Sequence, residues 1–424
     1  MKLQTARGVQ DTPPEEKIIK NQIVQTIKDV FELYGFAPLE TPIIERYETL
    51  AAKFAAGEAS DSLKEIFQLS DQGKRNLALR FDLTVPLARY VAMNPTLKMP
   101  FKRYEIGSVF RDGPIKAGRV RQFWQCDIDV VGSKSMLADA EILAIMDTVF
   151  QKLKLDVVIK VNNRKLLSGI LTQAGIKDQE NAIIAIDKLD KIGVVGVTEE
   201  LLNKNIEKKQ INKIFQLVQN DIKLTELKKK LTSEEALEGI QELEELFSYT
   251  KSMKLKSIKF DVSLARGLAY YTGTVFEVFL KKGKVTSSLG AGGRWDNMIG
   301  NFMDNNRIVP AIGGSFGLVP IIESIKEKQE LIQKTPAKVY VIPIKTEKES
   351  LTIVQELRDN SINASFDLTG RGMSKNLQYA NALGIPYAII IGDDELKKNK
   401  LLLRDMVTGE QKLLAIKSII KILK

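Results

Sequence analysis

The segment Leu264–Glu277 carries the residue types in this chain best suited to a reactive site. It reads LARGLAYYTGTVFE, so that Arg266 and two adjacent tyrosines, Tyr270 and Tyr271, precede a strand-like run that begins at Thr274. A buried strand seldom follows an arginine unless the cation meets an anion. Paired tyrosines give a pocket an apolar wall with polar tips. A hairpin with a surface arginine is the alternative interpretation.

A second concentration of polar residues lies on a predicted hairpin over residues 110–132. One strand ends at Arg111, and a loop with two glycines, a proline and Lys116 leads to the returning strand. Residues of equal parity share one face of a strand. That face carries cations, a ring, an amide and carboxylates: Arg119, Arg121, Phe123, Gln125, Asp127 and Asp129. The pattern indicates the floor of a polar ligand site, with arginine for phosphate and phenylalanine for a base, although an exposed ladder of ion pairs would produce it too.

The composition excludes several kinds of chemistry. The chain contains no histidine, which rules out Ser-His-Asp catalysis, zinc held by histidine and imidazole acid–base catalysis. Its one cysteine, Cys126, excludes an internal disulfide and a cysteine metal cluster. Arg, Lys, Asp, Glu, Tyr and the backbone remain. They suit reactions catalysed by positioning and electrostatics, such as phosphoryl or nucleotidyl transfer.

The overall composition is typical of a globular protein of two or three domains. The chain has 424 residues, of which 44% are hydrophobic and 27% charged. It lacks an apolar run of membrane-spanning length, and its N-terminus lacks the apolar core of a signal peptide, so we expect a cytoplasmic protein without a membrane partner. The net charge of +10 fits a polyanionic partner such as nucleic acid, but general enrichment in lysine would explain it equally well.

The elements that must position these residues form two regions. We expect a helix over 13–35, which starts at a proline pair, and then a strand over 37–46 that Pro38 and Pro42 confine to an edge or interface. Further strands with little helix between them predict an antiparallel sheet, at residues 65–69, 77–81, 102–110 and 121–131. Helices are expected at 86–93 and 138–153.

The second half of the chain predicts a helical insertion and a smaller domain. Residues 164–256 are helix-rich and almost without aromatic side chains. After a charged linker at 326–335, strands alternate with helices, which predicts a small α/β domain with a largely parallel sheet. The predicted organisation is therefore a catalytic domain (1–163 and 257–325), a helical insertion (164–256), the linker, and a C-terminal domain (336–424).

Several motifs resemble those of one known family. The hairpin 110–132 resembles motif 2 of class II aminoacyl-tRNA synthetases, and the segment 264–277 is similar to a stretch peculiar to histidyl-tRNA synthetases. Residues 77–84 (LALRFDLT) resemble the first substrate loop of that family, and Pro42 stands where motif 1 has its proline. Three short segments resemble the N-terminal signature and the anticodon-binding domain: 7–11, 374–377 and 384–387.

The resemblance implies a fold and an activity. The fold would be an α+β catalytic domain, built on an antiparallel class II sheet flanked by helices, with a helical insertion and an α/β anticodon-binding domain. The activity would be ATP-dependent ligation of L-histidine to tRNA(His) through a histidyl-adenylate, by a homodimer formed around Pro42.

Each matching position carries an implied role. Asp82 and Thr84 would hold the α-ammonium group of histidine, and Gln125 would contact the same head group. Asp129 and Tyr271 would hydrogen-bond the imidazole, while Tyr270 lines its pocket.

The ATP side rests on three implied residues. Arg111 would bind the α-phosphate and the histidine carboxylate, and Phe123 would stack on adenine. Arg266 would stabilise charge on the α-phosphate during attack by the carboxylate, in place of a metal ion. Mg²⁺ would serve the pyrophosphate, and no protein ligand for a metal is implied.

Two departures leave an alternative open. Val319 and Pro320 stand where motif 3 has an acidic residue and the arginine that covers adenine, and Ala269 replaces the usual aspartate before the tyrosines. The alternative is a non-catalytic, synthetase-like regulatory or tRNA-sensing protein. The complete set of substrate residues and the C-terminal domain favour the enzyme.

Overall fold

The computed structural model describes residues 3–51, 61–115, 120–218, 222–266, 270–303, 307–327 and 334–424. Lys116, Arg119 and Ala269, and residues 328–333 of the predicted linker, lie outside these ranges. The chain divides into two compact units, Met1–Gln10 with Ile23–Glu327, and Asp11–Gln22 with Lys328–Lys424. No helix in the described ranges has both the length and the apolar composition needed to cross a membrane.

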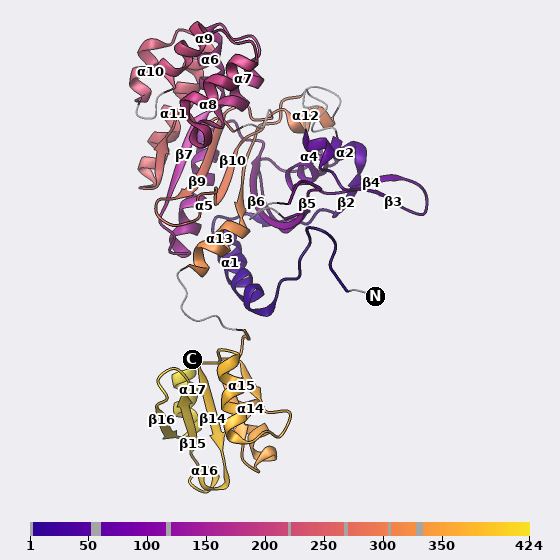
Figure 1. The fold of residues 1–424 in the computed structure, drawn as a ribbon, viewed down its shortest axis with the longest axis vertical. Helices are drawn as coiled ribbons and strands as arrows, with labels where there is room; N and C mark the ends of the chain where they lie inside the picture. Colours follow the sequence, from indigo (N-terminus) through magenta and orange to yellow (C-terminus); the bar gives the residue numbers. More distant parts are fainter. Residues whose placement is uncertain are drawn as a thin grey trace. The chain divides into compact units, whose positions relative to one another are not determined.

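The first unit is built on an eight-stranded sheet in the order β1-β5-β6-β11-β10-β9-β7-β8 (Figure 1). Its strands are β1 (Ala37–Pro38), β5 (Phe101–Phe110), β6 (Gln122–Val131), β11 (Ala311–Gly317), β10 (Gly290–Arg294), β9 (Thr274–Leu280), β7 (Val157–Asn163) and β8 (Ile258–Phe260). Neighbours from β5 to β7 pair antiparallel, and β1 and β8 add parallel edges. The predicted α+β fold with an antiparallel sheet is confirmed.

The predicted single strand over 37–46 is wrong, because the chain forms two short strands there. β1 ends at Pro38, and β2 (Ile44–Arg46) belongs to a separate three-stranded sheet with β4 (Asn76–Leu79) and β3 (Gln68–Ser70). Pro38 and Pro42 have no N–H to donate to a ladder, which accounts for the break.

Helices cover the large sheet. The core on one side joins α1 (Pro14–Leu33) and α5 (Met136–Lys152) to β11, where the Phe316 ring lies 5.8 Å from Phe31 and 5.5 Å from Phe150. Another core cluster, which includes Leu87, Trp295 and Ile299, joins α4 (Thr84–Met93) to α12 (Met298–Phe302). Shorter helices are α2 (Tyr47–Ala51), α3 (Asp61–Lys64) and α13 (Leu318–Lys326).

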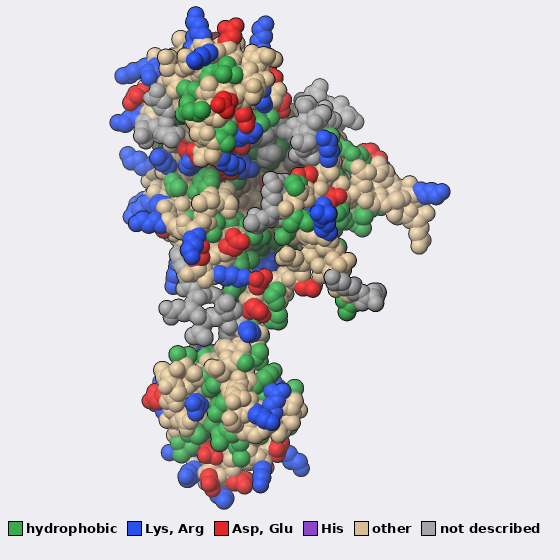
Figure 2. Space-filling view, in the orientation of Figure 1, with side chains coloured by type: hydrophobic (Ala, Val, Ile, Leu, Met, Phe, Trp, Pro, Cys, Tyr) green, Lys and Arg blue, Asp and Glu red, His purple; other side chains and the backbone are tan. Residues whose placement is uncertain are grey.

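The chain between β7 and β8 is helical, as Figure 1 shows. It contains α6 (Arg164–Ala174), α7 (Gln179–Ile186), α8 (Leu189–Asn203), α9 (Lys208–Leu217), α10 (Leu224–Lys230) and α11 (Glu234–Ser252). Gly169 lets α6 approach α11 closely, since a Cβ there would lie 2.4 Å from Ala236 Cβ. Lys and Arg side chains are spread over the visible faces of both units (Figure 2), so the surplus of positive charge does not by itself locate a nucleic-acid surface.

The C-terminal part of the second unit contains a five-stranded sheet in the order β13-β12-β14-β15-β16. Its strands are β12 (Val339–Pro343), β13 (Ala364–Phe366), β14 (Tyr387–Ile391), β15 (Leu401–Asp405) and β16 (Gln411–Leu414), and its helices are α14 (Glu347–Asp359), α15 (Met373–Ala382), α16 (Asp393–Lys397) and α17 (Ile416–Leu423). β13, β12 and β14 are parallel, but β15 and β16 pair antiparallel. The expected largely parallel sheet is therefore mixed, because the connection from β15 to β16 is too short for a crossover.

Candidate active site

The residues predicted to bind the substrate histidine line one cavity of about 610 Å³ in the first unit. They come from the loop before α4, from β6, and from the segment before β9. The predicted residues that line the cavity are Asp82, Thr84, Arg111, Gln125, Asp129, Arg266, Tyr270 and Tyr271. The cavity lies within the size range of small-molecule sites.

Arg111 also borders a second, smaller cavity of about 290 Å³. Its guanidinium carbon lies 4.3 Å from the centre of the Phe81 ring and 5.0 Å from that of Phe123. Phe123 lines this second cavity and not the larger one, and Val319 and Pro320 form part of the same wall. Val319 and Pro320, the two positions that depart from motif 3, thus share a cavity with Phe123, the ring predicted to stack on adenine.

Glycines on two strands make room for the polar side chains of the larger cavity. Gly313 on β11 pairs with Asp129 on β6, and a Cβ at Gly313 would lie 1.9 Å from Asp129 Oδ1. A Cβ at Gly293 on β10 would lie 2.8 Å from the Tyr271 ring. The close approach of backbone to side chain therefore requires glycine at both positions.

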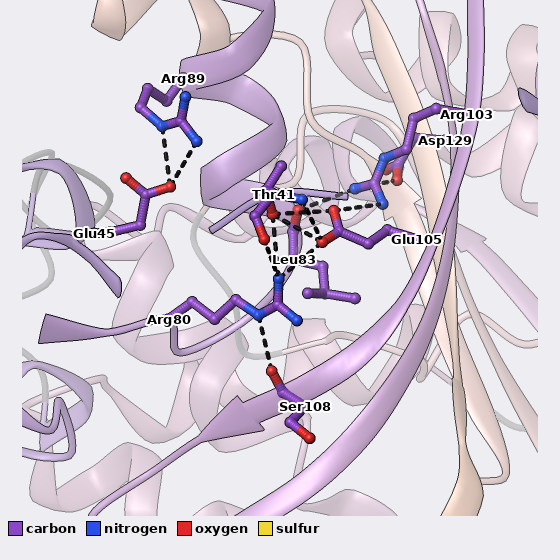
Figure 3. Close-up of polar contacts among 9 residues, drawn as sticks. All are labelled: Thr41, Glu45, Arg80, Leu83, Arg89, Arg103, Glu105, Ser108 and Asp129. Atoms are coloured by element: carbon purple, nitrogen blue, oxygen red, sulfur yellow. Dashed lines mark hydrogen bonds and ion pairs between the residues drawn. The ribbon is translucent and has the colours of Figure 1, made fainter. Parts of the chain in front are cut away.

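A buried network of charges supports the floor of the cavity (Figure 3). Arg103 on β5 is fully buried, and its Nη2 lies 2.9 Å from Asp129 Oδ2 and donates to the Leu83 carbonyl at 3.0 Å. Glu105, two residues further on β5, accepts hydrogen bonds from Arg80 at 2.8 Å and from the backbone N–H of Thr41 at 2.9 Å. The segment before Pro42 is thereby tied to β5, the strand whose Arg103 pairs with Asp129.

Arg266 forms an ion pair with Glu277 on β9. Its φ of 33° is unusual for a residue other than glycine, and both side chains are about four-fifths buried (exposed fractions 20% and 18%). Burial opposes the charge, but Coulombic attraction to Tyr271 and Glu277 raises the pKa of Arg266. The Arg266 guanidinium is therefore a permanent cation in the cavity wall, and the Glu277 carboxylate holds it in place.

Burial also shifts the acids of the cavity. It raises the pKa of Asp129 to about 6, although Arg103 and a hydrogen bond from Trp295 act in the opposite direction. Burial raises the pKa of Asp127 to about 8, again against the attraction of Arg103. The pKa of Tyr270 is raised to about 12, mainly by burial, so this hydroxyl keeps its proton at neutral pH.

The cavity also contains charged residues for which the sequence analysis predicts no role. Glu277 stands in the segment first quoted, and Asp127 lies on the predicted polar face, where its alternation with Gln125 and Asp129 was the available signal. Glu65, Asp187 and Lys191 also line the cavity, but they come from distant segments that carry no recognisable motif. Arg121 is the opposite case, since it pairs with Asp112 at 2.8 Å and is absent from the cavity wall.

Within the described ranges, no group of three or more carboxylates or thiols could hold a metal ion. No metal position is therefore assigned to the protein itself.

Comparison with known proteins agrees with this geometry. The family model "Histidyl-tRNA synthetase" matches residues 8–321, and the model "Anticodon binding domain" matches residues 338–424. Histidine--tRNA ligase 1 of Bacillus cereus is 44% identical over 417 residues, which are 97% of this chain and 95% of that relative. Histidine--tRNA ligase of Clostridium tetani is 38% identical over 98% of this chain and 97% of its own.

The fold of this chain also matches that of a solved structure. The crystal structure of histidyl-tRNA synthetase from Nostoc sp. PCC 7120 superposes with a TM-score of 0.88 at 34% identity, and the match covers 100% of this chain and 99% of that chain. The chain belongs to the histidyl-tRNA synthetase family.

Proposed function

We propose that this protein attaches L-histidine to tRNA(His) with ATP, through a histidyl-adenylate intermediate. The observation that carries the proposal is the single cavity in which all eight predicted histidine-site residues meet. Relatives that share most of their length with this chain bear the name Histidine--tRNA ligase.

Histidine binding follows from the polarity of the cavity walls. Asp82 and Thr84 hold the α-ammonium, and Gln125 lies beside them on β6. Asp129 and Tyr271 bind the two imidazole nitrogens, and the Tyr270 ring, whose centroid lies 4.5 Å from that of Tyr271, closes one wall. An amino acid that leaves these buried groups unpaired binds poorly, which gives selectivity for histidine.

Arginines carry the activation step. Arg111 holds the histidine carboxylate and the α-phosphate of ATP close together, and Arg266 stabilises the charge that develops on the α-phosphate. Arg266 must exchange its Glu277 carboxylate for the phosphate, because the two anions compete for one guanidinium. Mg²⁺ bound with ATP would serve mainly the pyrophosphate, where it would offset negative charge, and no protein ligand is assigned to it.

The smaller cavity suits adenine. Phe123 offers a ring for stacking, and Leu318, Val319 and Pro320 supply an aliphatic surface in the same cavity. Adenine would then be held by dispersion and stacking at the position where motif 3 otherwise places an arginine. Arg111, which borders both cavities, links the two halves of the adenylate.

The partners and the organisation follow from the same family. The C-terminal domain (336–424) binds the tRNA anticodon, and the linker (326–335) joins it to the catalytic domain. The insertion (164–256) divides the catalytic domain into residues 1–163 and 257–325. The protein acts in the cytoplasm. A homodimer forms around Pro42, where the neighbouring Ile43 and Ile44 are 44% and 52% exposed. The presence of both Arg111 and Arg266 favours catalysis over a regulatory role.

Histidine-dependent ATP–pyrophosphate exchange tests the proposal. Purified protein with Mg²⁺ should exchange pyrophosphate only when L-histidine is present, and it should then charge tRNA(His). Reactions that contain the other amino acids one at a time are the control. Absence of exchange with histidine, at a protein concentration where the fold is intact by circular dichroism, would contradict the enzyme assignment.

A further inference from the structure

A carboxylate with no assigned role faces the histidine cavity. Asp127 lies on β6 between Gln125 and Asp129, and its side chain is 3% exposed although it lines the cavity wall. Its Oδ1 atom is buried without a hydrogen-bond partner among the described residues. A buried carboxylate oxygen without a partner is costly, unless a ligand in the adjoining cavity supplies the missing donor.

The arginine that attracts Asp127, Arg103, is shared with another carboxylate. On β5, Arg103 pairs with Asp129, and Glu105, which lies directly across from Asp127, is matched by Arg80. On β11, the Ser315 side chain forms a hydrogen bond to Asp127. Asp82 from the loop before α4 adds a further negative charge nearby. This part of the cavity is therefore suited to a ligand cation.

The carboxylate already assigned to the α-ammonium is partly occupied. Asp82 Oδ1 accepts the backbone N–H of Val85 at 2.9 Å, at the start of α4. An ammonium group has three N–H donors that need acceptors. Thr84 and Gln125 offer only uncharged acceptors, so a second carboxylate beside Asp82 would add to the charge that holds the ammonium group.

We propose that Asp127 is a specificity-determining residue that binds the α-ammonium of histidine together with Asp82 and Thr84. The inference rests on the proposed function, because it assumes that histidine occupies the larger cavity. It adds a second carboxylate to the recognition of the ammonium group. It leaves the imidazole to Asp129 and Tyr271.

Binding by Asp127 couples histidine to a proton. Asp127 stays largely protonated at neutral pH without a ligand cation beside it, because burial and the charges of Asp129 and Asp82, which raise its pKa to about 8, outweigh the attraction of Arg103. An ammonium beside Asp127 favours the carboxylate, so the proton leaves when histidine binds. The contribution of Asp127 to affinity should therefore increase as the pH rises from about 6 toward about 8.

The test measures histidine affinity by calorimetry, without ATP, for the unaltered protein, Asp127→Asn and Asp147→Asn. Asp147 is a matched control, because it is 2% exposed and has a buried Oδ1 without a described partner, but it lies on α5 away from the cavity. The expected loss for Asp127→Asn is roughly tenfold or more near pH 8 and smaller near pH 6, with Asp147→Asn unchanged. A loss independent of pH, or an equal loss for Asp147→Asn, would overturn the proposal.

Two histidine analogues locate the contact. L-Histidinol keeps the ammonium group, whereas 3-(imidazol-4-yl)propanoate lacks it. Asp127→Asn should weaken histidinol binding as it weakens histidine binding, and should leave the propanoate affinity unchanged. An equal loss for the propanoate would place Asp127 at the imidazole and overturn the proposal.

The unaltered protein supplies a measurement that does not depend on the folding of a variant. Calorimetry near pH 7 in two buffers of different ionisation enthalpy should show up to about one proton released with histidine and less with the propanoate. Equal release for both ligands would contradict the inference. Absence of any histidine binding by the unaltered protein would instead contradict the proposed function, so the two failures are distinguishable.

Discussion

Arg103 and Asp129 form a buried ion pair across the β5–β6 ladder, with Arg103 Nη2 2.9 Å from Asp129 Oδ2. The same Nη2 donates to the Leu83 carbonyl, immediately after Asp82 in the chain. The Arg103 guanidinium thus holds in place both Asp129, which is proposed to bind the imidazole, and the loop with Asp82, which is proposed to bind the ammonium group. The geometry makes Arg103 a positioning residue that has no place in the cavity wall itself.

Replacement of Arg103 by methionine should damage both the fold and histidine binding. Removal of one partner from a buried ion pair costs about 3–5 kcal/mol of unfolding free energy. It should also raise the pKa of Asp129 further, since Arg103 is the cation that lowers it. Urea unfolding and histidine calorimetry measure the two effects. Arg89→Met is the control, because Arg89 pairs with Glu45 away from the cavity (Figure 3) and should leave histidine affinity unchanged.

Gly313→Ala should weaken histidine binding while the sheet still forms. The new Cβ would lie 1.9 Å from Asp129 Oδ1 and must displace this carboxylate. We expect overpacking to lower the free energy of unfolding by about 1–3 kcal/mol, which thermal melting measures. Calorimetry should show a loss of histidine affinity as well, because the displaced carboxylate no longer meets the ligand. Gly372→Ala is the control, since its Cβ would meet nothing within 4 Å. Histidine affinity equal to that of the unaltered protein would show that Asp129 does not contact the ligand.

Part of this site could be predicted from local pattern. Strand parity placed Gln125 and Asp129 on one face of β6, and the motif over 264–277 located Tyr271. Both depend on residues close together in sequence, for which alternation and turn chemistry are sufficient signals.

The support beneath the site could not be predicted in the same way. Arg103 and Glu105 belong to a charged run that resembles an exposed strand, and nothing local reveals that partners from the loop at Thr41 and from Asp129 permit their burial. Lys191 reaches the cavity from α8 of the insertion, which is distant in sequence from β6 and from the loop before α4. Tertiary contacts between distant segments decide such positions.

Arg266→Ala should abolish adenylation while part of the histidine affinity survives. Loss of a preorganised group that stabilises transition-state charge typically costs about 10²–10³ in rate. The imidazole and ammonium contacts remain, so calorimetry should still detect histidine. Arg266→Lys keeps the charge without the planar fork and should recover part of the pyrophosphate exchange. Near-normal exchange by the alanine variant would show that another group stabilises the phosphate.

Asn376→Ala should impair the C-terminal domain without affecting adenylation. Asn376 is fully buried, donates to Asp367 at 2.9 Å and to the Arg371 carbonyl at 2.8 Å, and accepts from Tyr340 at 3.1 Å. These groups lose their partner in the variant, at a cost of about 1–3 kcal/mol for each one left unsatisfied.

Charging of tRNA by the Asn376→Ala variant should therefore fall, whereas histidine-dependent exchange, which needs only the first unit, stays normal. The exposed Asn363→Ala, whose amide reaches only the Pro336 carbonyl, is the control. A parallel loss of exchange would show that the two activities are not separable in this way.

The stability of the first unit should fall as the pH rises from about 4 to about 8. Burial raises the pKa of Asp129 to about 6 and that of Asp127 to about 8, whereas both lie near 3.9 in the unfolded chain. Between these values the folded state binds more protons than the unfolded state, so each group lowers the unfolding free energy by up to about 1.4 kcal/mol per pH unit. Above the folded pKa the loss is complete and that contribution stops changing.

Asp127→Asn separates the two acids, because the contribution of Asp129 levels off above its folded pKa of about 6, whereas that of Asp127 continues to about pH 8. The variant should therefore be more stable than the unaltered protein at pH 8, and its stability should change less between pH 6 and pH 8. Tryptophan fluorescence in urea isolates the first unit, since both tryptophans of the chain, Trp124 and Trp295, belong to it. Saturating histidine should reduce the difference between the two proteins, because the ligand ammonium stabilises the Asp127 carboxylate only in the unaltered protein. Parallel stability curves for the two proteins across this range would show that Asp127 does not titrate there.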